Sequence, residues 1–99
     1  MWEIKKFEIS HHFSKLENLQ SEKTLTYSLL YKGGNTLISL KETTSDKKIY
    51  VESCLLPETD FAYAENVAVL MCENCVDIYT WKNLLEDIGI KYIVTEPNA

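Results

Sequence analysis

The chain contains no arginine, and all ten of its basic residues are lysine. No lysine lies between Val51 and Trp81, a stretch that holds six acids. Residues 1–50 carry eight lysines against six acids, and residues 51–99 carry two against nine, so charges of +2 and −7 make up the net −5. Proteins that bind nucleic acid neutralise its phosphates with Lys and Arg, and arginine is the commonest reader of base edges. The composition therefore argues against direct binding to nucleic acid or to an anionic membrane.

Glycine, proline and long apolar runs are also scarce. With three Gly, two Pro and no low-complexity linker, residues 1–99 are expected to form a single domain. The longest uninterrupted apolar run, Val67 to Cys72, is far shorter than the about 20 residues that a membrane-spanning helix needs. No apolar segment follows the lysines near the N-terminus, as it would in a signal peptide. We therefore expect no membrane contact and a cytoplasmic location.

Three consecutive stretches predict an antiparallel meander. Thr24 to Lys32 alternates apolar and polar residues with the period of a half-buried strand. Gly33-Gly34 follows, and glycine readily adopts the positive φ angles that a tight primed turn requires. Thr36 to Glu42 and Lys48 to Leu56 are the second and third strands, and Pro57 ends the run because it cannot donate to a ladder.

The segments at either end of the chain are less regular. Trp2 to Ile9 predicts a first strand with a bulge, because its apolar residues change phase midway. Ser10 to Lys23 is expected to be a loop or one short helix, with His11-His12 exposed at the end of the strand. Ile90 to Thr95 is a last short β-like run.

Two amphipathic helices are predicted after the meander. The first is capped by Thr59 or Asp60, and its apolar arc collects Phe61, Ala64, Val67, Ala68, Met71, Cys72 and Cys75. The second runs from a cap at Thr80 to Gly89, which fits the C′ position. Helices grouped after strands indicate an α+β fold, an antiparallel sheet of three to five strands with two helices packed on one face.

Cys72 and Cys75 form a CxxC motif. In redox proteins such a pair sits at a helix N-terminus, where the dipole stabilises the thiolate. Here both cysteines are predicted in the last helical turn, on the apolar arc, which favours a packing role. Two alternatives stay open: a redox pair, or a structural zinc site completed by Cys54, His11 or His12.

No other group of residues is placed for catalysis or cofactor binding. Ser39 and Ser53 fall within predicted strands rather than on a sharp turn. Gly33-Gly34 is not followed by a helix N-terminus that could bind phosphate. Glu58 and Asp60 precede a helix, where negative charge is favourable. We therefore expect no enzymatic activity, no cofactor and no metal.

Two resemblances add to these patterns. The expected hairpin, third strand and two short helices lie between Tyr27 and Ile88, with Val76 to Thr80 leading into the second helix, which ends on Leu85-Glu86-Asp87-Ile88. This arrangement resembles a family of small proteins of unknown function in clostridia and related Firmicutes, which implies the fold and no mechanism. In size and charge the chain also resembles phage-encoded inhibitors of bacterial defence, including anti-CRISPR proteins, many of which occupy nucleic-acid-binding surfaces of their targets.

The hypothesis that these features favour is a non-catalytic inhibitor or regulator that covers a basic, nucleic-acid-handling surface of a protein partner. Its expected binding residues are six acids and three apolar anchors that lie off the buried arc: Glu52, Glu58, Asp60, Glu65, Glu73, Asp77, Tyr63, Val69 and Leu70. One alternative is a housekeeping regulatory domain of Firmicutes that acts as a homodimer or larger homo-oligomer through the off-arc residues. The other is the CxxC redox or zinc module.

Overall fold

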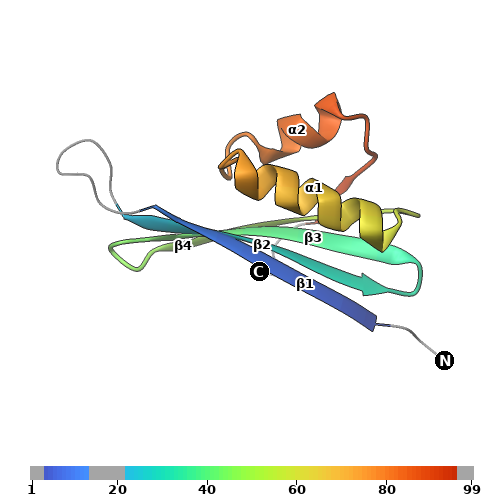
Figure 1. The fold of residues 1–99 in the computed structure, drawn as a ribbon, viewed down its shortest axis with the longest axis horizontal. Coiled ribbons are helices and arrows are strands. Elements are labelled where there is room, and N and C mark those ends of the chain that lie inside the picture. The colour runs from blue at the N-terminus through green and yellow to red at the C-terminus, as the bar shows by residue number, and fades with distance from the viewer. Residues whose placement is uncertain (1–3, 14–21, 96–99) are drawn as a thin grey trace.

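The computed structural model describes residues 4–13 and 22–95. Its elements, in chain order, are β1 Ile4–Phe13, β2 Lys23–Lys32, β3 Asn35–Thr44, β4 Ile49–Leu56, α1 Phe61–Glu73, α2 Trp81–Asp87 and β5 Ile93–Thr95. The five strands form one antiparallel sheet in the order β1-β2-β3-β4-β5, and both helices lie over the same face of it (Figure 1). The predicted α+β class, with helices on one face of an antiparallel sheet, is confirmed.

The predicted β2–β3 hairpin is confirmed. Lys32 pairs with Asn35 across the turn, and the register continues without interruption to Lys23 opposite Thr44. The two turn residues, Gly33 and Gly34, have φ angles of 62° and 87°. Two successive positive φ values are the signature of a type I′ turn, whose twist matches that of the flanking strands.

β1 differs from the prediction in length and regularity. It continues past Ile9 to Phe13, because Phe7, Ile9 and Phe13 keep a two-residue period and pack against the core. Its pairing with β2 is unbroken along all ten residues, so the predicted bulge is wrong for the part of β1 that is described. His11 and His12 lie within this strand and not in a loop. The loop or short helix predicted for residues 14–21 falls outside the described residues.

The core fills the space between the sheet and the helices. Alternate residues of β2 and β3 point into it, as do β4 residues Cys54 and Leu56 and six residues of α1. Its largest fully buried side chains are Trp81, Tyr27, Leu25, Ile38, Leu40, Leu56, Met71 and Leu85. No helix in residues 4–13 and 22–95 has the length and apolar character to cross a bilayer.

The end of α1 corrects the placement of Cys75. The helix ends at Glu73, and Cys75 follows the C-cap residue with a φ of 53°. The Cys75 N–H donates to the Cys72 carbonyl (3.2 Å), and the Val76 N–H donates to the Met71 carbonyl (3.0 Å). These two bonds are those of a Schellman motif, so Cys75 occupies the left-handed C′ position that glycine usually takes. It therefore lies beyond the apolar arc rather than on it.

α2 ends in the same motif, with the residue that was predicted for it. Gly89 has a φ of 78°, and its N–H donates to the Glu86 carbonyl at 3.0 Å. The Ile90 N–H donates to the Leu85 carbonyl at 3.1 Å. The prediction that Gly89 closes this helix is confirmed.

Among the residues that the structure describes, no helix lies over the other face of the sheet (Figure 1). Cross-strand hydroxyl pairs lie on it, with Ser10 Oγ 3.0 Å from Thr26 Oγ1 and Ser39 Oγ 2.8 Å from Ser53 Oγ. A shallow hollow of about 340 Å³ opens between β1, β2 and β3, and its lining includes Lys6, Glu8, Ser28, Leu30, Leu37 and Ser39. We call this side of the sheet the open face.

Candidate protein-binding surface

Glu52, the first acid of the predicted patch, has its partners inside the molecule. It lies in β4, is half-buried, and accepts a hydrogen bond from Trp81 Nε1 at 2.8 Å. Lys82 Nζ is 3.4 Å from the same carboxylate oxygen. Because the Trp81 side chain is fully buried, its indole N–H needs an acceptor, and Glu52 supplies it. We therefore assign Glu52 a structural role in the contact between the sheet and α2.

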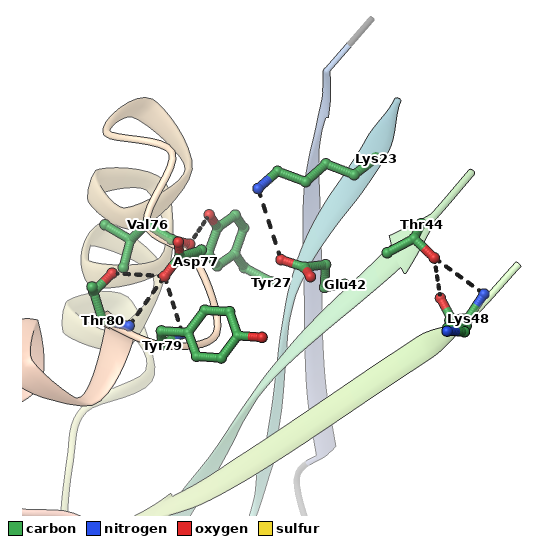
Figure 2. Close-up of polar contacts among 9 residues, drawn as sticks. All are labelled: Lys23, Tyr27, Glu42, Thr44, Lys48, Val76, Asp77, Tyr79 and Thr80. Atoms are coloured by element: carbon green, nitrogen blue, oxygen red, sulfur yellow. Dashed lines mark hydrogen bonds and ion pairs between the residues drawn. The ribbon is translucent and has the colours of Figure 1, made fainter. Parts of the chain in front are cut away.

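Asp77 also has local partners, in the turn that leads into α2. Its Oδ1 accepts hydrogen bonds from the backbone N–H of Tyr79 (3.0 Å) and of Thr80 (3.1 Å), and from Thr80 Oγ1 (3.0 Å) (Figure 2). Such a carboxylate orders the turn by satisfying amides that no helix partner can reach. Thr80 is the N-cap of α2 as predicted, but its side chain makes no capping hydrogen bond.

The remaining four acids lie along α1 and at its N-terminal end. Glu58 is in the preceding turn with a φ of 55°, and Asp60 is the N-cap, without the predicted side-chain capping bond. Glu65 is half-buried and Glu73 is exposed in the last turn. α1 has thirteen residues, and twelve steps of 1.5 Å separate its ends by about 18 Å. The acids are therefore spread along α1 and around it, with Glu65 on a different side from Tyr63 and Leu70, and they do not form a single cluster.

Two of the three predicted anchors form one exposed stripe on α1. Tyr63 is 46% exposed and Leu70 is 39% exposed. They are seven residues apart, which is two helical turns, so their side chains lie on the same side of the helix. Val69 is half-buried at the edge of this stripe. The acids at the two ends of α1 thus flank an exposed apolar pair.

Tyr79 is a further exposed residue, which no pattern in the sequence indicated. It follows α1 in the turn before α2, and 82% of its surface is accessible. Its backbone is held by Asp77, so the exposed ring stands on an ordered turn. A tyrosine between the two predicted helices was nonetheless a usable signal, because tyrosine is enriched among the residues that dominate interface energetics. We call Glu58, Asp60, Glu65, Glu73, Tyr63, Leu70 and Tyr79 together the acidic helical surface.

Cys54 and Cys72 are buried, and Cys75 is half-buried beyond the end of α1. Cys72 is buried in α1, and burial raises the pKa of its thiol, with smaller contributions from Cys75 and Glu73. Burial likewise raises the pKa of the Cys54 thiol from 9.0 to about 11. A redox or metal-binding cysteine needs an accessible thiolate, which these surroundings disfavour. Within residues 4–13 and 22–95, no three His, Cys, Asp or Glu side chains are grouped closely enough to hold a metal ion.

Comparison of the chain with protein-family models, with curated proteins and with solved structures found no match. The resemblances to a clostridial family and to phage-encoded inhibitors therefore stay predictions from the sequence.

Proposed function

We propose that this protein is a non-catalytic protein-binding module of the cytoplasm. In this proposal the acidic helical surface docks on a basic, nucleic-acid-handling surface of a target protein and blocks it, as an inhibitor or regulator. The chain resembles phage-encoded inhibitors of bacterial defence in size and charge, and many of those inhibitors occupy nucleic-acid-binding surfaces of their targets. The proposal rests on the exposed side of α1, where acids flank apolar side chains.

The four acids of the acidic helical surface are not neutralised by any residue that the structure describes. Glu58, Asp60, Glu65 and Glu73 form no ion pair with any lysine of residues 4–13 and 22–95. Across residues 58–91 there are seven acids and two lysines, a charge of −5, and one of those lysines, Lys82, is paired with Glu52. A surface with one sign of charge accelerates encounter with a partner of opposite charge, and the effect weakens as salt screens it.

The apolar residues would supply the affinity that charge alone does not give. Tyrosine is enriched among the few residues that dominate interface energetics, because it buries a large rigid area. Tyr63, Leu70 and Tyr79 are exposed, and on α1 the first two are separated by Asn66 rather than by a charge. Rim charges set the rate and specificity of encounter, while the buried anchors determine how long the complex lasts.

A matched pair of variants tests the proposal. In the first, four acids of the acidic helical surface are neutralised: Glu58→Gln, Asp60→Asn, Glu65→Gln and Glu73→Gln. In the control, four exposed acids elsewhere are neutralised: Glu22→Gln, Asp46→Asn, Glu86→Gln and Asp87→Asn. Both variants have the same net charge, so they separate the location of the charge from its total.

The readout is capture from a bacterial lysate at low and high salt, followed by mass spectrometry and by competition with nucleic acid. We expect the wild-type protein and the control to retain a nucleic-acid-handling protein that is released as salt rises. The first variant should lose it, and the bound wild-type protein should displace nucleic acid from the captured target. Equal capture by the two variants, or a target that binds nucleic acid equally well when occupied, would overturn the proposal.

A further inference from the structure

β1 forms a long and regular open edge of the sheet. It is the first strand in the sheet order, and among residues 4–13 and 22–95 its one partner strand is β2, with which it pairs through ten residues without a bulge. Its sequence contains neither proline nor glycine. At the opposite edge, the three residues of β5 pair with β4 at Ser53–Leu55, so among the described residues this edge is divided between β5 and the first half of β4. An edge strand presents unpaired backbone N–H and C=O groups on its outer side, and proline, bulges or short length are the usual means of blocking further pairing.

The core is incompletely covered along the same edge. Phe7 and Ile9 point to the helical side and pack against the core, yet both remain half-exposed. Lys5, on the same side, lies over its own molecule's aromatic rings, with Nζ 5.7 Å from the Tyr31 ring centroid and 5.8 Å from that of Phe61. A strand added beside β1 would cover the apolar side chains that are left partly open.

We propose that the strand that pairs with this edge is β1 of a second copy, antiparallel, about a two-fold axis at Phe7. In an antiparallel pair, directly opposed residues point to the same face. With the axis at Phe7, Lys6 stands opposite the partner's Glu8, and Glu8 stands opposite the partner's Lys6. The strand is therefore complementary in charge to itself. Two copies would form one continuous ten-stranded sheet with all helices on one side.

Two neighbouring registers of the same symmetry lack this complementarity. An axis at Glu8 would place the two Glu8 carboxylates directly opposite each other, which is destabilising. An axis at Ile9 would place Lys6 opposite His12 and Glu8 opposite Ser10, so no ion pair would form. In the Phe7 register, the Phe7 rings of the two copies also meet on the helical side, where Ile9 is already half-covered by the core. Aromatic cross-strand pairs of this kind stabilise antiparallel sheets.

Exchanging the charges at Lys6 and Glu8 tests two things: whether a second copy pairs with β1, and whether it does so in the Phe7 register. Lys6→Glu and Glu8→Lys each convert both cross-strand ion pairs into like-charge oppositions, and we expect the dimer dissociation constant to rise about tenfold or more. When the two variants are mixed in equal amounts, the acids of one face the lysines of the other, so a heterodimer of near wild-type affinity should form. The double variant, with both substitutions, should likewise dimerise as the wild-type chain does.

Sedimentation equilibrium over micromolar to millimolar concentration measures these constants, and circular dichroism shows whether each variant is folded. The control is Lys41→Glu. Lys41 is exposed, and its strand β3 is not at an edge of the sheet, so this substitution should not change the dissociation constant. A wild-type chain that stays monomeric would overturn the proposal and leave a foreign extended segment as the occupant of the edge. A dimer insensitive to the charge exchange, or one abolished by Tyr63→Ser with Leu70→Ser, would overturn it too.

This inference does not rest on the proposed function, because β1 and the exposed side of α1 are different surfaces. If the protein captured a target but stayed monomeric at every concentration tested, the proposed function would stand and the proposed dimer would be wrong. A charge-dependent dimer that captures no target would do the reverse.

Discussion

The hydroxyl of Tyr27 donates to the backbone carbonyl of Val76 at 2.6 Å and thereby joins β2 to the turn between the helices (Figure 2). The side chain is fully buried, and burial raises the pKa of the phenol well above its ordinary value. In Tyr27→Phe the carbonyl would lose this donor within the protein. We expect a loss of about 1–3 kcal/mol in the free energy of unfolding, measured by urea denaturation. The same change at exposed Tyr50 should have little effect, and equal losses would refute the assignment.

Glu52 is predicted to act on stability and not on partner binding. Glu52→Ala removes the acceptor of the buried Trp81 indole N–H, which should cost about 1–3 kcal/mol. Glu52→Gln keeps an acceptor and gives up the ion pair with Lys82, which is partly exposed and so contributes little, and it should cost less than 1 kcal/mol. Thermal unfolding measures both. If Glu52→Gln weakened target capture as strongly as neutralising the α1 acids, Glu52 would belong to the binding surface after all.

Cys75→Gly is predicted to stabilise the protein. Cys75 holds a left-handed backbone conformation with a φ of 53°, in which a Cβ atom is unfavourable and glycine is not. The substitution should raise the free energy of unfolding by up to about 1 kcal/mol. Cys72→Gly, inside α1, is the matched control and should lower it. A destabilised Cys75→Gly variant would mean that the thiol makes a contact worth more than the backbone strain.

The meander was predictable because its signals are local. Alternation in β2 and the Gly33-Gly34 turn each need only neighbouring residues, and so does Gly89 at the end of α2. The end of α1 was not predictable by the same rule, because Cys75 takes the position without being glycine. The length of β1 was missed because His11 and His12 resemble loop residues, and their strand pairing depends on partners in β2.

The candidate surface was predictable in composition and not in its connections. The sequence indicated how many acids lie between Val51 and Trp81, and it showed that Tyr63 and Leu70 lie off the buried arc. That Glu52 meets Trp81 depends on how α2 docks on β4, a contact between residues 29 positions apart. Such pairings are set by tertiary packing, which no local pattern encodes.

Alkaline pH is predicted to destabilise the fold, because the buried Cys54 thiol and Tyr27 phenol keep their protons to a higher pH than in the unfolded chain. Burial raises the pKa of the Cys54 thiol from 9.0 to about 11, so between those values the unfolded chain has lost a proton that the folded chain retains. Folding then releases less free energy as pH rises, by up to about 1.4 kcal/mol per pH unit for one proton. Tyr27, whose pKa is also raised, adds to the loss above pH 10. Urea unfolding of Cys54→Ala at pH 8 to 11 should give a shallower decline than the wild-type chain, whereas parallel curves would remove Cys54 as a cause.

Tyr79 is predicted to contribute to target binding without contributing to stability. Because its ring is 82% exposed, Tyr79→Ala should change the free energy of unfolding by less than about 0.5 kcal/mol. If Tyr79 is a hot spot of the interface, its loss should cost about 2 kcal/mol, about thirtyfold in the dissociation constant, mainly through faster release. Surface plasmon resonance on the captured target measures both rate constants. Ile49→Ala is the matched control, since Ile49 is 59% exposed on the open face and lies outside the acidic helical surface. If the two variants bound equally well, the anchor would have to be sought at Tyr63 and Leu70, and the turn that Asp77 orders would serve only to begin α2.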